Sequence, residues 1–148
     1  MNKQITIVAS SFVLKDRKFL VAKRADDDDF MAGYWEIPGG KVDDDEDLKL
    51  ATIREMQEEC GIDIIAEYVL VLKHYFHETN PNREYIEIFY LGKQIDNNQE
   101  VTLSHEHSEY RWVTFQELKA LQPISRYTFG VLDELASHPL VTNQLGVM

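Results

Sequence analysis

The stretch GKVDDDEDLKLATIREMQEECGI, residues 40–62, decides the fold, because it predicts a polar loop followed by one helix. Aspartates at positions 43–45 can cap this helix, since its N-terminal end favours negative charge. Gly61 is suited to end it, because glycine tolerates the left-handed conformation that closes many helices. We therefore expect a helix from about residue 46 to residue 60.

Three glutamates dominate this predicted helix. Glu55, Glu58 and Glu59 stand at positions i, i+3 and i+4, which places their carboxylates on one face. Like charges at this spacing destabilise an isolated helix, and a bound divalent cation would compensate them. A solvated acidic face is the alternative when the glutamates are taken alone. Apolar residues that can pack on a sheet occupy the opposite side, at Ile53, Met56 and Cys60.

The spacing of residues in this stretch resembles the Nudix box, G-x5-E-x7-R-E-U-x-E-E-x-G-U, in which U is a bulky aliphatic residue. The segment YWEIPGGK before the box and the segment EYRWV after it resemble the MutT-like branch of that family. The resemblance therefore extends over most of the chain and outweighs the alternative of a solvated face. The matching positions of the box are Gly40, Glu46, Arg54, Glu55, Met56, Glu58, Glu59, Gly61 and Ile62.

The resemblance implies both a fold and a reaction. We expect a fold of the α/β (α+β) class, an α/β/α sandwich with a mixed β-sheet, formed by a single domain over residues 1–148. The implied enzyme is a metal-dependent pyrophosphohydrolase that cleaves a phosphoanhydride bond of a nucleoside triphosphate or a related nucleoside diphosphate derivative. A nucleoside triphosphate would yield nucleoside monophosphate and pyrophosphate.

The same resemblance implies a metal site. Glu55, Glu58 and Glu59 are expected to ligate an essential Mg²⁺ or Mn²⁺. A backbone carbonyl of Gly39 or Gly40 is expected to join them. Oxygen donors suit these hard cations, which commonly bind through a few carboxylates together with substrate phosphates.

Two further box residues are expected to support the site. Arg54, counted with Glu58 among the catalytic residues, should form a salt bridge with Glu46 that holds the loop against the helix. An arginine fork can bind a carboxylate through two hydrogen bonds and so orient neighbouring groups. Glu46 and Gly61 would then be structural residues of the box.

The general base has more than one candidate. Members of the family use either a glutamate of the box or one from a downstream loop, which here means Glu55 or Glu106, and less favourably Glu109. His105 and His107 flank Glu106, but adjacent histidines in a loop are more often surface residues than metal ligands. We therefore assign no metal to them.

Substrate contacts are expected from both sides of the box. Lys41 and Arg24 are candidates for binding the phosphates, because both side chains are cationic near neutral pH. Tyr127 and Phe129 lie where the MutT-like branch contacts the base. Aromatic residues can stack on a base, although in strands they are more often part of the core.

Composition limits the partners. The formal net charge of −11 opposes general binding to nucleic acid, whereas carboxylates loaded with cations can attract a small phosphate ligand. The single cysteine, Cys60, cannot form an intrachain disulfide, which favours the cytoplasm. We find no membrane span and no export signal. We expect a small nucleotide substrate and a monomer or homodimer.

Patterns outside the box predict the remaining elements. Apolar runs separated by polar turns indicate two hairpins, and cap-like residues indicate two later helices. The hairpins span 5–14 with 19–21, and 62–77 with 83–95; short strands are expected at 34–37 and 109–113, and helices at 114–121 and 125–137.

Two alternative functions remain. One is hydrolysis of ADP-ribose or a dinucleoside polyphosphate, but Pro81 lies 19 residues after Ile62 (81 − 62), later than the ADP-ribose branch places its proline. Positions 78–80 also lack the tyrosine that marks the dinucleoside polyphosphate branch. The other is a non-catalytic module that senses a nucleotide. The complete set of box glutamates speaks against that role.

Overall fold

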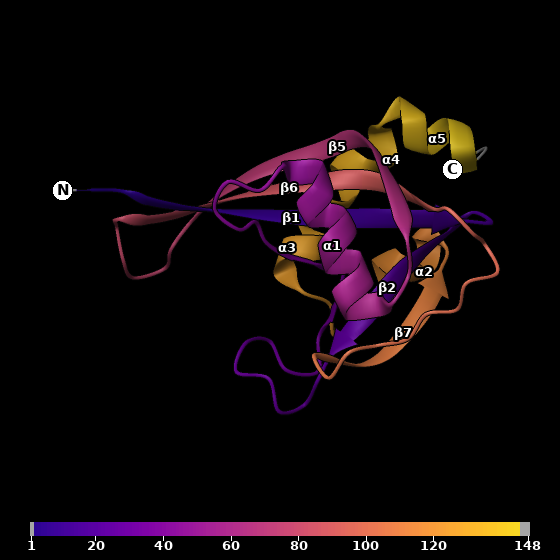
Figure 1. Cartoon of the computed structure of the whole chain (residues 1–148), viewed down its shortest axis with the longest axis horizontal. Coiled ribbons are helices and arrows are strands. Elements are labelled where there is room, and N and C mark those ends of the chain that lie inside the picture. Colours follow the sequence, from indigo (N-terminus) through magenta and orange to yellow (C-terminus); the bar gives the residue numbers. More distant parts are fainter. Residues whose placement is uncertain (1, 146–148) are drawn as a thin grey trace.

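The computed structural model describes residues 2–145, which form one mixed sheet with helices packed on it (Figure 1). The strands are β1 (Gln4–Lys15), β2 (Lys18–Arg24), β3 (Trp35–Glu36), β4 (Gly39–Lys41), β5 (Ile64–Phe76), β6 (Arg83–Gln94) and β7 (His107–Val113). The helices are α1 (Leu48–Cys60), α2 (Phe115–Ala120), α3 (Arg126–Phe129), α4 (Leu132–Ser137) and α5 (Pro139–Leu145).

Strand β1 organises the sheet. It pairs with β2 in antiparallel fashion only near the turn, at Leu14↔Phe19 and Lys15↔Lys18. Along most of its length it runs parallel to β6, from Gln4↔Arg83 to Val13↔Gly92. The strand order is β3-β2-β1-β6-β5, with β4 added to β1 and β7 to β2. Both predicted hairpins and the predicted mixed sheet are therefore present.

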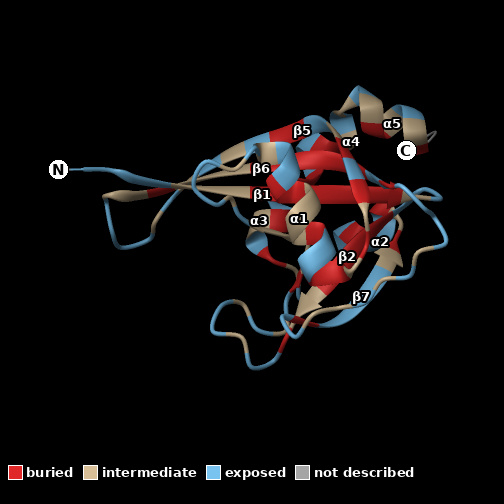
Figure 2. Cartoon of the chain, viewed as in Figure 1, coloured by how far each residue is buried: buried red, intermediate tan, exposed pale blue. Residues whose placement is uncertain are grey.

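Helices cover both faces of the sheet. In Figure 1, α1 crosses in front of the strands, and its Met56 and Cys60 pack in a cluster with Val13 and Leu20. On the other face, a larger cluster joins side chains of β1, β2 and β6 to α2, α4 and α5. Figure 2 shows the buried residues concentrated in the strands between these layers. The architecture is thus an α/β/α sandwich.

Helix α1 begins later than predicted. Its N-cap is Asp47, whose carboxylate accepts a hydrogen bond from the backbone N–H of Leu50 at 3.1 Å. Asp45 instead adopts a positive φ of 61° in the turn before the helix. The predicted end is present, because Gly61 adopts φ 66° and its N–H bonds to the carbonyl of Gln57.

The prediction of one continuous closing helix over 125–137 is wrong. The chain forms α3, α4 and α5 instead, because Gly130 caps α3 and His138 caps α4. Pro139 then starts α5, which extends beyond the predicted end. Proline suits the first position of a helix because its missing N–H would have no partner there.

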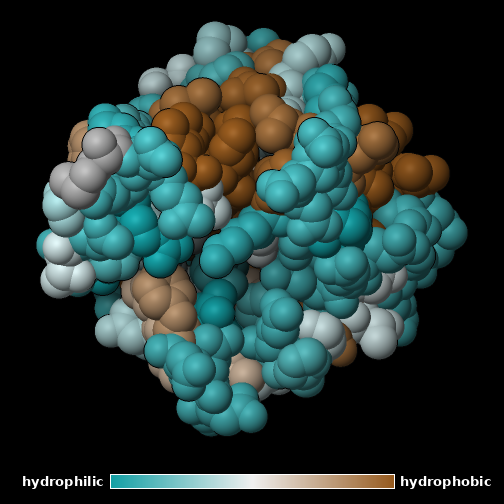
Figure 3. All heavy atoms as spheres, turned by 60° about the vertical axis from the view of Figure 1, so that its left-hand side comes forward, coloured by the Kyte–Doolittle hydropathy of each residue, from teal (hydrophilic) through white to brown (hydrophobic). Residues whose placement is uncertain are grey.

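The edge strand β5 carries several exposed apolar side chains. Leu72 and Phe76 are 58% and 71% exposed. Figure 3 shows apolar side chains gathered in the upper part of this view, above a largely hydrophilic remainder.

Among residues 2–145, no helix combines the length and the apolar character that are needed to cross a membrane.

Candidate active site

Two glycines of β4 bring the chain against α1 and β1. A Cβ atom on Gly39 would lie 2.6 Å from the carbonyl oxygen of Ala9, and one on Gly40 would lie 2.5 Å from the carboxylate of Glu55. Cβ atoms in proteins essentially never come so close to other heavy atoms. Glycine at both positions therefore lets β4 pair with β1 while it lies beside α1.

Glu59 is the buried carboxylate of the site. It is 5% exposed, and its Oε2 accepts a hydrogen bond from the backbone N–H of Gly39 at 3.1 Å. Burial raises its pKa well above the ordinary value, and the nearby charges of Glu36, Glu55 and Glu106 raise it further. Several carboxylates therefore meet where α1 ends.

Glu55 and Glu58 differ from Glu59 in exposure. Glu55 is partly buried and accepts a hydrogen bond from Arg54 Nη1 at 3.0 Å, yet burial still raises its pKa. Glu58 has a side chain that is 59% exposed and accepts from the same nitrogen at 3.1 Å. The three carboxylates therefore share a side of α1 but not an environment.

The expected pair between Arg54 and Glu46 is present. Arg54 Nε donates to Glu46 Oε2 at 2.7 Å, and Arg54 Nη2 donates to Glu46 Oε1 at 2.9 Å. Arg54 Nη2 also donates to the carbonyl of Lys41 at 3.2 Å. The hydrogen bond from Arg54 lowers the pKa of Glu46 to about 2, helped by the backbone N–H of Asp43. Arg54 thus ties the loop to α1.

The oxygen donors at the site fit a hard divalent cation, although they are not arranged as a preformed coordination site. Among residues 2–145, no three His, Cys, Asp or Glu side chains are placed to hold a metal ion. Arg54 engages two of the three glutamates expected to bind the metal, Glu55 and Glu58, and the N–H of Gly39 engages the third, Glu59. The donors are nevertheless all oxygen, and the raised pKa values of Glu55 and Glu59 indicate negative charge that is poorly neutralised.

A second cluster lies behind these carboxylates and was not found from the sequence. His107 Nε2 lies 2.9 Å from Glu36 Oε2, and the His107 side chain is 1% exposed. Arg24 pairs with Glu36 at 3.1 Å and with Asp28 at 2.8 Å. The expectation that both loop histidines lie on the surface is therefore wrong for His107. No short-range signal could have revealed this contact, since 71 residues separate its partners.

The two predicted phosphate-binding cations differ in their availability. Besides its two carboxylate partners, Arg24 donates from Nε to the carbonyl of Phe30 at 2.7 Å. Lys41 is exposed and forms no ion pair within the described part of the chain. Glu106 is exposed in the loop before β7, where its carbonyl accepts from the N–H of Ala25 at 2.9 Å.

The two residues predicted to contact the base, Tyr127 and Phe129, differ in their contacts and exposure. The ring of Tyr127 meets that of Tyr75 edge-on, with centroids 4.9 Å apart, and is tilted against that of Phe30, with centroids 6.1 Å apart. Phe129 is 57% exposed and makes no ring contact with residues 2–145. The structure therefore places Tyr127, but not Phe129, in an aromatic group.

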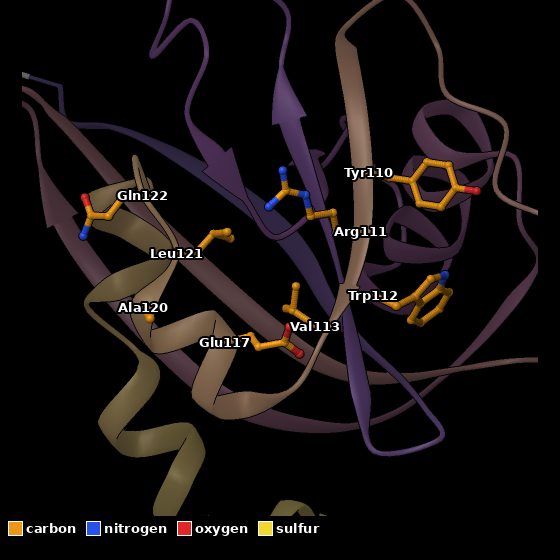
Figure 4. Close-up of a pocket in the computed structure, with 8 residues that line it drawn as sticks. All are labelled: Tyr110, Arg111, Trp112, Val113, Glu117, Ala120, Leu121 and Gln122. Carbon is orange, nitrogen blue, oxygen red and sulfur yellow. The ribbon is translucent and has the colours of Figure 1, made fainter.

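A hollow of about 670 Å³ lies away from the box, between β7 and α2 (Figure 4). In Figure 4, Arg111 and Val113 lie on the side of β7 on which α2 lies, whereas Tyr110 and Trp112 lie on the other side. None of the lining residues belongs to the box. The guanidinium of Arg111 lies 4.7 Å from the ring of Trp35. This hollow therefore plays no part in the candidate site.

Comparisons with known proteins identify the family of the chain. A family model described as the NUDIX domain matches residues 5–132. CTP pyrophosphohydrolase from Escherichia coli (strain K12) is 44% identical over 68 residues, which are 45% of this chain and 49% of the relative. The aligned region thus spans about half the length of that protein. Nucleoside triphosphatase NudI from Escherichia fergusonii is 29% identical over 124 residues, 78% of this chain and 86% of the relative.

A solved structure gives the same result for the fold. The MutT protein from Methanosarcina mazei Go1 has a TM-score of 0.74 and 27% identity, and the match covers 93% of this chain and 99% of that chain. Fold, box geometry and relatives together define a hydrolase that acts on phosphorus-containing anhydrides. The chain belongs to the NUDIX domain family. The predicted family, MutT-like likeness and fold class are confirmed.

Proposed function

We propose that the chain is a metal-dependent pyrophosphohydrolase that converts a nucleoside triphosphate to nucleoside monophosphate and pyrophosphate. The observation that carries the proposal is the burial of Glu59 among Glu36, Glu55 and Glu106, directly beside the glycines of β4. Such a concentration of carboxylates is costly unless a cation neutralises it. The names of the relatives, a CTP pyrophosphohydrolase and a nucleoside triphosphatase, support the substrate class.

In this proposal Glu55, Glu58, Glu59 and the carbonyl of Gly40 would hold Mg²⁺ or Mn²⁺. When bound, the cation supplies positive charge that activates water and neutralises phosphate oxygens. Glu58 would have to exchange its hydrogen bond with Arg54 for the cation. The loss of this hydrogen bond costs little stability, because the Glu58 side chain is 59% exposed and exposed ion pairs contribute little to the free energy of unfolding.

The remaining roles fall to neighbouring side chains. Glu106 accepts the proton of the attacking water; it is a better candidate than Glu55, whose carboxylate is engaged by Arg54. Lys41 contacts the phosphates, because it is exposed and free of carboxylate partners among residues 2–145. Arg24 would first have to leave Glu36 and Asp28, so we assign it to the support of Glu36. Tyr127 contacts the base.

The proposal extends to the setting of the enzyme. Its single cysteine, Cys60, is buried and forms no disulfide, as expected for a protein of the reducing cytoplasm. The described residues, 2–145, belong to one domain, and the enzyme acts as a monomer or homodimer on a small nucleotide.

Product identification tests the reaction. The purified chain is incubated with Mg²⁺ and a panel of canonical and oxidised nucleoside triphosphates, ADP-ribose and dinucleoside polyphosphates, and the products are separated. We expect a triphosphate to yield monophosphate and pyrophosphate, with activity abolished by EDTA and restored by excess Mg²⁺. Release of orthophosphate and nucleoside diphosphate as first products would overturn the proposal.

Isotopic labelling locates the attack. In ¹⁸O-labelled water, label found only in pyrophosphate indicates attack at the β phosphorus, and label found only in the monophosphate indicates attack at the α phosphorus. Preferential turnover of ADP-ribose or a dinucleoside polyphosphate would keep the reaction class but replace the proposed substrate.

A further inference from the structure

A half-buried carboxyl on β6 is not used by the proposed chemistry. Glu87 Oε2 accepts a hydrogen bond from Ser10 Oγ at 2.7 Å. No cationic side chain pairs with Glu87 in the part of the chain that the structure describes. Each oxygen of a half-buried acidic side chain normally has a cationic or hydrogen-bonding partner. Glu87 therefore retains an unused hydrogen-bonding position.

An aromatic group stands next to this carboxyl. Lys73 and Tyr75 of β5 lie opposite Glu87 and Tyr85 of β6, so Tyr75 and Glu87 project from the same face of the sheet. The hydroxyl of Tyr75 is buried and has no hydrogen-bond partner within residues 2–145. Its ring lies edge-on to Tyr127 at 4.9 Å. Aromatic rings next to free polar groups are what a nucleobase requires, because it stacks by its face and hydrogen-bonds by its edge.

Close packing connects Glu87 to the acidic site. A Cβ atom on Gly39 would lie 2.1 Å from Ser10 Oγ, the same oxygen that donates to Glu87. The N–H of Gly39 in turn donates to Glu59. Only Ser10 and Gly39 therefore separate Glu87 from the carboxylates at the end of α1. A nucleotide whose phosphates lie at those carboxylates can place its base beside Glu87.

We propose that Glu87 is a specificity-determining residue that accepts a hydrogen bond from an exocyclic amino group of the base. The inference rests on the proposed nucleotide hydrolysis and narrows its substrate class to bases that carry such a group. An ionised carboxylate only accepts hydrogen bonds, so a carbonyl in place of the amino group would face it without a proton between them. A site built around a hydrogen bond rejects an analogue that cannot form it.

The electrostatic environment disfavours the ionised form of Glu87 unless a hydrogen-bond donor binds it. Burial raises the pKa of Glu87 to about 7, opposed by the hydrogen bond from Ser10 and increased by the charge of Glu36. The pKa of Tyr75 is also raised, first by burial and then by the charge of Glu87. An amino donor would stabilise the ionised carboxylate, which forms no ion pair within residues 2–145, because its cross-strand neighbour Lys73 pairs with Glu134.

Matched pairs of substrates test the proposal. In each pair one base carries an amino group that the other lacks: cytosine and uracil, adenine and hypoxanthine, or guanine and hypoxanthine. In the first two pairs a carbonyl and an adjacent ring N–H replace the amino group and its neighbouring ring nitrogen, whereas guanine and hypoxanthine differ in the amino group alone. We expect the amino member of at least one pair to be favoured about tenfold in kcat/KM, the effect of one hydrogen bond to a charged group. Glu87→Gln should reduce that ratio to near 1, because an amide can either donate to a carbonyl or accept from an amino group. Glu100→Gln, the same change at an exposed loop residue, should keep the wild-type ratio.

Equilibrium binding separates this inference from the proposed function. Dissociation constants are measured for the α,β-methylene analogues of the same nucleotides, which need no turnover. If nothing is hydrolysed but the amino analogue binds more tightly to the wild type than to Glu87→Gln, the proposed reaction fails and the base preference stands. Should Glu87→Gln not fold, Glu87→Asp keeps a carboxylate and should retain the direction of the preference. Equal binding within all three wild-type pairs would overturn the inference, as would a preference that survives in Glu87→Gln.

Discussion

Replacement of Glu59 by glutamine tests whether the acidic cluster destabilises the protein without a cation. Glu59 is 5% exposed, and burial together with the charges of Glu36, Glu55 and Glu106 raises its pKa. A carboxyl whose pKa is raised on folding lowers stability as the pH rises above its unfolded pKa, because the folded state then binds more protons than the unfolded state. Glutamine has a similar shape and can still accept the hydrogen bond from Gly39.

The magnitude follows from the burial of this group. Removal of a buried charge that no cation neutralises should stabilise the metal-free protein by at least about 1 kcal/mol at neutral pH. For a chain of about 150 residues this raises Tm by about 2–4 °C. The difference should vanish below the ordinary glutamate pKa of 4.5, where both states are protonated, and should grow as the pH rises.

Glu58→Gln is the matched control. The Glu58 side chain is 59% exposed and pairs with Arg54 at 3.1 Å, so its replacement should slightly lower stability, by less than about 1 kcal/mol. Thermal unfolding is followed by calorimetry between about pH 4 and pH 8 in EDTA and again with excess Mg²⁺. Because a ligand that binds only the folded state stabilises it, Mg²⁺ should raise the Tm of the wild type more than that of Glu59→Gln.

Turnover supplies the second measurement. Glu59→Gln and Glu58→Gln should each lower kcat by about 10² or more, since each removes a ligand charge. If Glu59→Gln unfolds at or below the wild-type temperature in EDTA near pH 7, the buried glutamate is a structural residue and the reasoning from charge is refuted. Wild-type turnover at low Mg²⁺ would refute the ligand assignment separately.

Three other changes test the neighbouring residues. Gly40→Ala should lower activity by about tenfold or more but change stability by only about 1 kcal/mol. The reason is that the new Cβ would lie 2.5 Å from the carboxylate of Glu55 and displace that flexible side chain. Activity assays and thermal unfolding check the two values. Glu106→Gln should lower kcat by about 10²–10⁴ and remove the acidic limb of the pH profile of kcat. If Glu106→Gln keeps that limb and Glu55→Gln loses it, Glu55 is the general base instead. The pKa of Glu46 is lowered to about 2, so its contribution to stability is present above 4.5 and lost as the pH falls toward 2; acid unfolding of Glu46→Gln should therefore start from a lower stability and change less over this interval.

Local spacing accounts for the parts of the site that the sequence predicted. Gly61 ends α1 as expected, and the Arg54–Glu46 pair spans only eight residues. The start of α1 was less predictable, because several successive aspartates could each cap a helix and only the path of the loop selects Asp47. Gly130 and the His138–Pro139 junction likewise break a helical pattern that appears continuous in the sequence.

The sequence by itself determined the family, the main helix and the presence of an acidic site, because a fixed spacing along one helix places side chains on one side without help from the rest of the chain. Only the tertiary structure decided which carboxylate is buried and which other groups surround it. His107 reaches Glu36 across 71 residues because β7 pairs with β2, and Ser10 reaches Glu87 across 77 residues because β1 runs parallel to β6. Strand pairing of this kind depends on the packing of both sheet faces, which no local pattern specifies.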